Sequence, residues 1–173
     1  MAPPLVVLGG LPGTGKTTVA RALALRIGAA HVRVDSIEQA LVDAGLTGEL
    51  GPLGYAAAYA VAGDQLTLGC AVVADSVNPI ELTRAAWRDV AARAGARLVE
   101  VELTCSDRAE HRRRVTERVG DITRLRLPSW ADVLAREYHP WAPDLTLDTA
   151  ALSPDEAAAL IADAVVAARA VAG

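Results

Sequence analysis

The chain has 173 residues, 52% of them hydrophobic, so it can bury one sizeable core, and a second independent domain is not expected. Its net charge of −4 argues against binding of long nucleic acid, although a short basic patch for a 5′-hydroxyl end stays open. The sequence has neither a bilayer-spanning apolar run nor the basic start of a signal peptide, so we expect no membrane association and a cytoplasmic location. A monomer and a homodimer are both compatible with it.

The first expected strand, Leu5 to Leu8, leads into a phosphate-binding loop. The run Gly10-Leu11-Pro12-Gly13-Thr14-Gly15-Lys16-Thr17 fits the pattern G-x-x-x-x-G-K-[ST] at every fixed position, and a helix is expected from Lys16 to Ile27. Glycines let successive N–H groups point at phosphates, and the helix N-terminus adds partial positive charge. Lys16 is expected to reach the β- and γ-phosphates, and Thr17 to give its hydroxyl to Mg²⁺. The alternative is a glycine-rich turn that binds nothing, which the Lys-Thr pair and the flanking elements disfavour. The nucleotide-binding candidates are Gly10, Leu11, Pro12, Gly13, Thr14, Gly15, Lys16, Thr17 and Thr18.

Asp35 follows the second expected strand, His31 to Val34. A carboxylate there can face the γ-phosphate and accept the proton of an acceptor hydroxyl, as a general base does in phosphoryl transfer. The run Asp35-Ser36-Ile37-Glu38 also fits a capping box for a helix from Ser36 to Asp43, with Asp35 as N-cap. Both interpretations of Asp35 stay open at this point.

The third expected strand, Ala71 to Ala74, ends in Asp75. An acid after an apolar strand is typical of a residue beside the Mg²⁺, because this hard cation takes oxygen ligands. The alternative role is a cap for the turn that follows. Before this strand, Tyr55 and Tyr59 lie one turn apart on an expected helix and can form a wall of an acceptor pocket. The acceptor-binding candidates are Asp35, Tyr55, Tyr59, Asp75 and Asn78.

The densest cationic stretch runs from Asp107 to Arg118 on an expected helix. Arginine binds phosphate oxygens bidentately and offsets charge in the transition state, so we expect Arg114 or Arg118 to contact the nucleotide. Arg112 and Arg113 are expected to face solvent. The alternative is a solvated helix in which Glu110 pairs with Arg114, a contact worth only about 0.3 to 0.5 kcal/mol.

Strand-like and helix-like segments alternate along the whole chain, which predicts a parallel α/β sheet with helices on both faces. Ligands of such sheets bind at the carboxyl ends of the strands. The last two strands are expected over Arg97 to Leu103 and Leu145 to Leu147. The remaining helices are expected over Tyr55 to Leu68, Ile80 to Ala94, Asp107 to Val119, Trp130 to Glu137 and Pro154 to Val171.

The cysteines and histidines show no spacing typical of metal ligands. Cys70 and Cys105 lie in apolar stretches and are expected to be buried free thiols. His31, His111 and His139 are expected to be ordinary surface or edge residues.

Together, the phosphate loop, Asp35, the segment from Val73 to Asn78 and the arginine-rich helix resemble the small P-loop kinases. The likeness is to the group of chloramphenicol phosphotransferase, zeta toxin kinases, gluconate kinase and bacterial polynucleotide kinases. It implies a three-layer P-loop NTPase fold with a five-stranded parallel sheet in the order 2-3-1-4-5, and a short lid at approximately 108–130. It also implies that Asp35 contacts or deprotonates the acceptor hydroxyl, that Asp75 serves the Mg²⁺ site, and that Arg114 and Arg118 close over the phosphates.

The sequence therefore predicts a single domain over 1–173 that moves the γ-phosphoryl group of ATP, with Mg²⁺, to a hydroxyl of a small molecule. Lys16, Asp35, Arg114 and Arg118 are the catalytic candidates. Nucleosides, sugars or sugar acids, and antibiotics all stay open as acceptors, because the segment from Leu41 to Leu68 matches no acceptor signature. The alternatives are a nucleotide hydrolase, against which the missing N-K-x-D motif speaks, and a non-catalytic nucleotide-binding regulatory module.

Overall fold

Five parallel strands form the central sheet of the computed structural model, which describes residues 2–48 and 50–170. The strand order is β2-β3-β1-β4-β5, which confirms the predicted topology. The strands are β1 (Pro4–Gly9), β2 (Ala30–Arg33), β3 (Val72–Asp75), β4 (Arg97–Thr104) and β5 (Leu145–Asp148). The helices in these residues are α1 (Lys16–Ile27), α2 (Val34–Asp43), α3 (Leu53–Thr67), α4 (Glu81–Ala94), α5 (Arg108–Thr116), α6 (Trp130–Ala135) and α7 (Pro154–Ala170).

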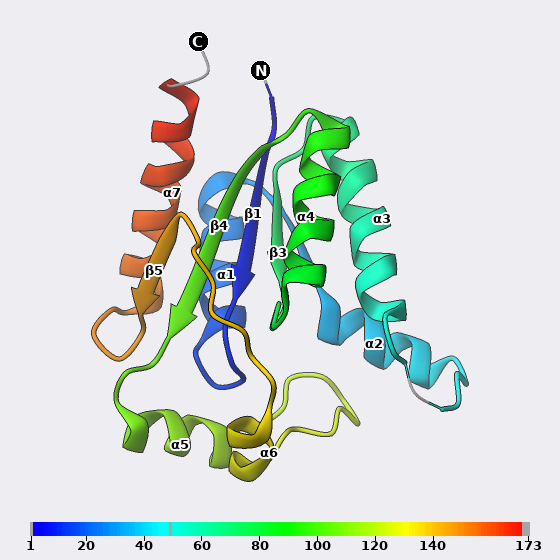
Figure 1. The fold of residues 1–173 in the computed structure, drawn as a ribbon, viewed down its shortest axis with the longest axis vertical. Helices are drawn as coiled ribbons and strands as arrows, with labels where there is room; N and C mark the ends of the chain where they lie inside the picture. The colour runs from blue at the N-terminus through cyan, green and yellow to red at the C-terminus, as the bar shows by residue number, and fades with distance from the viewer. Residues whose placement is uncertain (1, 49, 171–173) are drawn as a thin grey trace.

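Helices cover both faces of the sheet, with α1 and α7 on one face and α3 and α4 on the other (Figure 1). The alternation of side chains along β1 explains this layering, since successive residues of a strand point to opposite faces. Val6 and Leu8 belong to the core that α1 and α7 cover, whereas Leu5 and Val7 belong to the core under α3 and α4. A strand that is apolar on both faces, as the sequence predicts for β1, therefore lies at the centre.

Several helices begin or end at residues that the sequence marks. Gly28 ends α1 with a φ of 65°, a conformation that glycine adopts without a Cβ clash. The Asp107 side chain caps α5 by accepting hydrogen bonds from two backbone N–H groups. Ser129 and Asp132 form a capping box at the start of α6. Among the described helices, none combines the length and apolarity needed to cross a membrane.

Several predicted features differ from the structure. Helix α2 begins at Val34, which the apolar pattern had placed in the strand, and α5 ends at Thr116 rather than at Val119. Val171, the predicted end of the last helix, lies outside the described residues. Cys70 is exposed and Cys105 only partly buried, because each lies in a connection next to a strand rather than within it.

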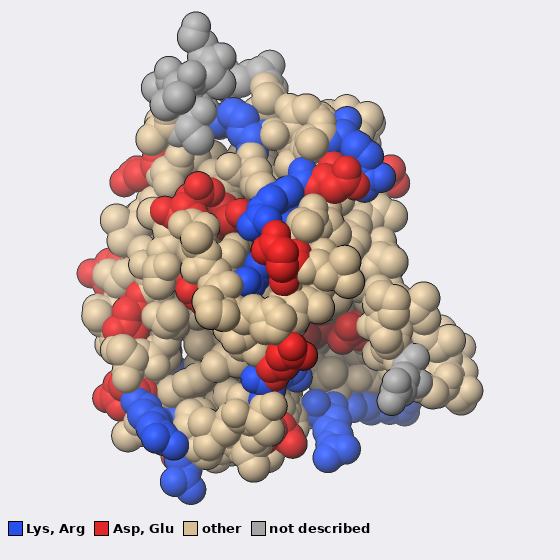
Figure 2. All heavy atoms as spheres, viewed as in Figure 1, with Lys and Arg blue, Asp and Glu red and all other residues tan. Residues whose placement is uncertain are grey.

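The short helices α5 and α6 lie beyond the carboxyl ends of the strands (Figure 1). Arginine side chains gather along this same edge of the molecule in Figure 2, in spite of the negative net charge. Exposed Arg108, Arg112 and Arg113 of α5 belong to this edge. The carboxyl end of the sheet is thus the side on which anions are attracted.

Candidate functional site

The loop between β1 and α1 has a backbone that requires glycine. Gly10, Gly13 and Gly15 have φ values of 139°, 86° and 85°, a region that other residues rarely adopt. A Cβ at Gly10 would lie 2.3 Å from the carbonyl oxygen of Leu103, and one at Gly13 would lie 2.5 Å from Cγ2 of Val115. Gly15 is the N-cap of α1 and provides no side-chain cap, so the first N–H groups of this helix are available to an anion. The loop is therefore shaped for phosphate.

Lys16 lies inside this loop and is mostly buried. Its Nζ donates a hydrogen bond to the carbonyl oxygen of Leu11 at 2.9 Å. Burial lowers the pKa of Lys16 from 10.5 to about 8, and the charges of Asp75 and Asp35 only partly oppose this shift. An anionic ligand would favour the protonated form of this amine.

Asp75, at the end of β3, is buried beside the start of α1. Its Oδ2 lies 3.2 Å from Nε2 of His31 and 3.8 Å from Nε of Arg33, and the hydroxyl of Thr17 also hydrogen bonds to the carboxylate. Burial alone would raise the pKa of Asp75, but the hydrogen bond from His31 and the charge of Lys16 hold it below its usual value. Asp75 is thus an ionised oxygen donor next to a hydroxyl. No group of three or more His, Cys, Asp and Glu able to hold a metal is present within the described residues, so a cation here would need further oxygens from a ligand.

Asp35 lies in the first turn of α2, and the capping-box interpretation of this residue is wrong. Arg33 is the N-cap of α2, and no side chain caps the helix. Because the helix begins one residue before Asp35, the carboxylate lies too far into the first turn to act as the N-cap. It is partly exposed, and its Oδ2 is 3.8 Å from Nη2 of Arg33.

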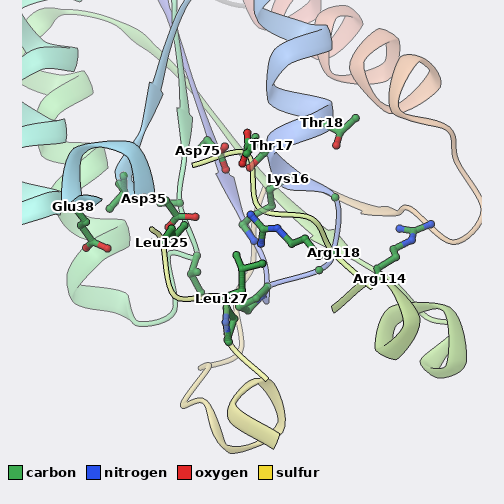
Figure 3. A pocket seen from close by; sticks show the side chains of 18 of the residues that line it. Lys16, Thr17, Thr18, Asp35, Glu38, Asp75, Arg114, Arg118, Leu125 and Leu127 are labelled. Carbon is green, nitrogen blue, oxygen red and sulfur yellow. The ribbon is translucent and has the colours of Figure 1, made fainter. Parts of the chain in front are cut away.

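These residues open into one cavity of about 560 Å³ at the carboxyl ends of the strands (Figure 3). The phosphate loop, Asp75 and α1 form one side, and Asp35, Glu38 and Tyr55 form another. The loop 117–129, which joins α5 to α6, lies across the opening with Leu125 and Leu127. The cavity includes these sequence-predicted residues: Pro12, Gly13, Gly15, Lys16, Thr17, Thr18, Asp35, Tyr55, Asp75, Arg114 and Arg118.

The two candidate arginines differ in their contacts. Arg114 donates to Glu110 at 2.7 Å and to the hydroxyl and carbonyl oxygens of Thr149 at 2.9 and 3.0 Å, so it is already bound within the fold. Arg118 makes no hydrogen bond or ion pair with any described residue. Burial is the main cause of the lowered pKa of Lys16, and the charge of Arg118 adds to it, whereas the acids oppose it. Figure 3 shows the Arg118 side chain directed toward Lys16, whereas the Arg114 side chain is directed away from Lys16 and from Arg118. The expected Glu110–Arg114 pair is therefore present, and Arg118 is the arginine that faces the phosphate loop.

Two acceptor candidates lie outside the cavity. Tyr59 packs edge-on against Trp87 with ring centroids 4.6 Å apart, and its hydroxyl donates to the carbonyl of Thr83. Asn78 is completely buried with a φ of 53°, and it acts through its backbone N–H, which donates to the hydroxyl of Tyr55 at 3.0 Å. Helical spacing alone placed both tyrosines on one wall, but only Tyr55 lines the cavity.

Several site residues carried no signal in the sequence. His111 is buried rather than at the surface, and its Nε2 lies 2.8 Å from the carbonyl oxygen of Pro12 in the phosphate loop. The hydroxyl oxygen of Thr149 lies within hydrogen-bonding distance of the carbonyl oxygens of Thr14 and Thr104, at 3.0 and 2.9 Å. Asp121 of the loop 117–129 accepts from both terminal nitrogens of buried Arg33, at 2.8 and 3.1 Å. Only long-range packing brings these groups together, so local patterns could not have found them.

Comparisons with known proteins agree with this geometry. The AAA_33 family, described as an AAA domain, matches residues 5–140, and the chain belongs to this family of P-loop kinase-like domains. A search of curated proteins finds no match.

Three solved structures with the same fold illustrate the comparison. One is the Mycobacterium tuberculosis APS kinase CysC in complex with AMPPNP and APS, with a TM-score of 0.73, 24% identity, and coverage of 95% of this chain and 98% of that one. Another is Chaetomium thermophilum Kti12 in complex with ADP-AlF3, with a TM-score of 0.72, 21% identity, and coverage of 95% and 98%. A gluconokinase from Sinorhizobium meliloti 1021 has a TM-score of 0.64, 18% identity, and coverage of 95% and 97%. At these identities the likeness establishes the P-loop fold.

Proposed function

We propose that this protein transfers the γ-phosphoryl group of ATP, with Mg²⁺, to a hydroxyl group of a small molecule. The observation that carries the proposal is that Asp35 opens into the same cavity as Lys16 and Thr17. A switch or a simple nucleotide holder needs the phosphate loop but has no use for a carboxylate opposite it. The structure of an APS kinase with AMPPNP and APS, which has the same fold, adds support.

The donor half of the reaction belongs to the phosphate loop. The N–H groups at the start of α1 and the ammonium of Lys16 would hold the β- and γ-phosphates. The Thr17 hydroxyl and the Asp75 carboxylate are adjacent oxygen donors that fit Mg²⁺, which would offset charge on the β- and γ-oxygens. Arg118 would place a further positive charge near the transferred group, whereas Arg114 supports Thr149 behind the loop.

The acceptor half would use Asp35. Its carboxylate would accept the proton of the acceptor hydroxyl as the oxygen attacks the γ-phosphorus and the bond to the bridging oxygen of ADP breaks. The loop 117–129 would exclude water, so that transfer to the acceptor outcompetes hydrolysis. We also propose that the lid expected over 108–130, which includes the loop 117–129, moves to open and close the site.

The test is acceptor-dependent release of ADP, measured with and without Asp35→Asn. The variant should keep its calorimetric affinity for ATP within about threefold and lose at least about 10²-fold in kcat, because removal of a general base affects the chemical step. Asp64→Asn, an exposed acid on α3, is the matched control and should behave as the unchanged protein. ADP release that is independent of every acceptor would instead indicate a hydrolase, and ATP binding without turnover would indicate a regulatory module.

A further inference from the structure

Two acids of α2, Asp35 and Glu38, face the acceptor side of the cavity together. They are three residues apart, so they share one face of the helix, and both line the cavity. Figure 3 shows Asp35 between Glu38 and Lys16, which puts Glu38 farthest from the phosphate loop. The charge of Asp35 acts on both Lys16 and Glu38, in agreement with this order. The proposed reaction uses Asp35 and leaves Glu38 without a role.

Glu38 has a built place in the fold. Gly54 of α3 lies directly against it, since a Cβ at Gly54 would come 2.2 Å from Cγ and 2.7 Å from Oε1 of Glu38. Any other residue at position 54 would displace this carboxylate. The packing of α2 on α3 therefore holds Glu38 at the cavity wall rather than letting it extend into solvent.

The carboxylate of Glu38 lacks a cationic partner. No hydrogen bond or ion pair joins it to any residue in the described ranges, although it is half-buried. Burial raises the pKa of Glu38, the charge of Asp35 raises it further, and the smaller effect of Arg136 opposes both. A half-buried acid beside a second acid is an unfavourable arrangement on its own, and a bound cation would relieve it.

Tyr55 supplies the third component of this wall. Its hydroxyl accepts a hydrogen bond from the N–H of Asn78 at 3.0 Å, which fixes the ring beside the two acids. Carboxylates together with an aromatic ring are the groups that recognise ammonium ions.

We propose that the acceptor is an alcohol that also carries an ammonium group, such as an amino sugar or an amino alcohol. This inference rests on the proposed function and names the substrate class of the same site. The ammonium binds Glu38 and the ring of Tyr55, and the hydroxyl points at Asp35. The hydroxyl oxygen forms a bond to the γ-phosphorus, the bond from that phosphorus to the β,γ-bridging oxygen breaks, and the hydroxyl proton passes to Asp35 and then to water. The products are the phosphate ester of the amino alcohol or amino sugar, with its ammonium group unchanged, and ADP.

At this wall the acids outweigh the arginines of the cavity, since the charge of Asp35 acts on Glu38 more strongly than that of Arg136 does. Arg118, Arg126 and Arg136 come from the loop 117–129 and the end of α6, and Arg118 is directed at the phosphate loop. An acid group bound next to Glu38 would meet two carboxylates at short range, which opposes binding. The same two carboxylates would attract a bound cation.

Matched pairs of acceptors test the inference: D-glucosamine against D-glucose, and ethanolamine against ethylene glycol, with D-gluconate as an anionic acceptor. In whichever pair the protein phosphorylates, we expect kcat/KM for ADP release to be at least about tenfold higher with the amine than with its neutral partner. Glu38→Gln should raise the KM for the amine at least about tenfold, with kcat and the KM for ATP within about threefold. Glu38→Asp, which keeps the charge, should restore much of this loss, and Glu81→Gln on the exposed start of α4 is the matched control.

The outcomes separate this inference from the proposed function. Equal or better turnover of neutral or anionic acceptors, or an unchanged KM for the amine in Glu38→Gln, would overturn the inference and leave phosphotransfer intact. If the protein binds ATP but releases no ADP in the presence of any of the five acceptors, the result counts against both the inference and the proposed function. A folded Glu38→Gln variant, verified by its thermal unfolding, is required for each of these outcomes.

Discussion

The phosphate loop and the loop 117–129 lie on the same cavity, but they are held in place by different means. Buried contacts fix the phosphate loop: His111 bonds to Pro12, Thr149 bonds to Thr14, and Val115 packs against Gly13. The loop 117–129 is held chiefly by ion pairs from Asp121 to Arg33 and Arg21 and from Arg124 to Asp43. This difference in attachment fits the proposed phosphotransfer, in which a cover would have to open for two substrates and two products.

The largest effect should come from a methyl group added to the rigid side. Gly13→Ala forces a Cβ to 2.5 Å from Val115 at a φ of 86°, so the loop must change shape. We expect calorimetric affinity for ATP to fall by at least about 10²-fold, as several N–H contacts to phosphate are lost together.

Gly63→Ala is the matched control for this change. Gly63 lies within α3, has no positive φ, and has no neighbouring atom within 4 Å of the place that a methyl group would occupy. Alanine there should be neutral or stabilise the protein by about 0.5 to 1 kcal/mol. Similar ATP affinity in both variants would mean that the phosphate loop adapts, and the contrast between the two loops would disappear.

The second effect is a pH dependence that arises from burial of Lys16. The pKa of this amine is about 8 in the free protein, so it loses its proton as the pH rises through 8. The triphosphate binds the protonated form, and ATP affinity should therefore fall roughly tenfold between pH 7 and pH 9, where the phosphates themselves are already ionised. Calorimetry across this range measures the slope. Lys16→Met should bind more weakly at every pH and show no such slope, and a slope that persists in this variant would assign the titration to another group.

The fold was predictable because its signals are local. Apolar runs separated by helix-like segments indicated all five strands of the described chain, and the bounds predicted for the helix from Lys16 to Ile27 match the structure. Helix α2 was the exception, because Val34 continues an apolar strand pattern and no capping side chain marks the start of the helix.

The site was predictable mainly on its donor side, although the predicted Asp35 and Tyr55 also line the cavity. The phosphate loop, Lys16, Thr17 and Asp75 follow from a motif and from strand ends that meet at one edge. Thr149 supports the loop from a position 135 residues away from Thr14, and His111 does so from 99 residues away, so no spacing rule could find either. The sequence pattern places Glu38 in a capping box, whereas in the structure it lines the cavity and packs against Gly54 of another helix, which no local pattern indicates.

The smallest effect should come from the cover itself, through Asp121. Asp121→Asn weakens a two-point contact with Arg33, a buried side chain, and a contact with Arg21 on α1. Hydrogen bonds between charged groups of this kind contribute about 1.5 kcal/mol, so amide hydrogen exchange in 117–129 should accelerate roughly tenfold while β1 and α1 stay protected.

Asp43→Asn gives the comparison that makes this last measurement decisive. Asp43 holds the same loop through Arg124, but that pair spans 3.8 Å and both side chains are largely exposed. Exposed pairs contribute about 0 to 1 kcal/mol, so exchange in 117–129 should change by no more than about threefold. If the two variants loosen the loop equally, burial of Arg33 adds nothing to its attachment. If Asp121→Asn also exposes β1, the loop and the sheet open as one unit, and the distinction between a rigid donor site and a separate cover fails.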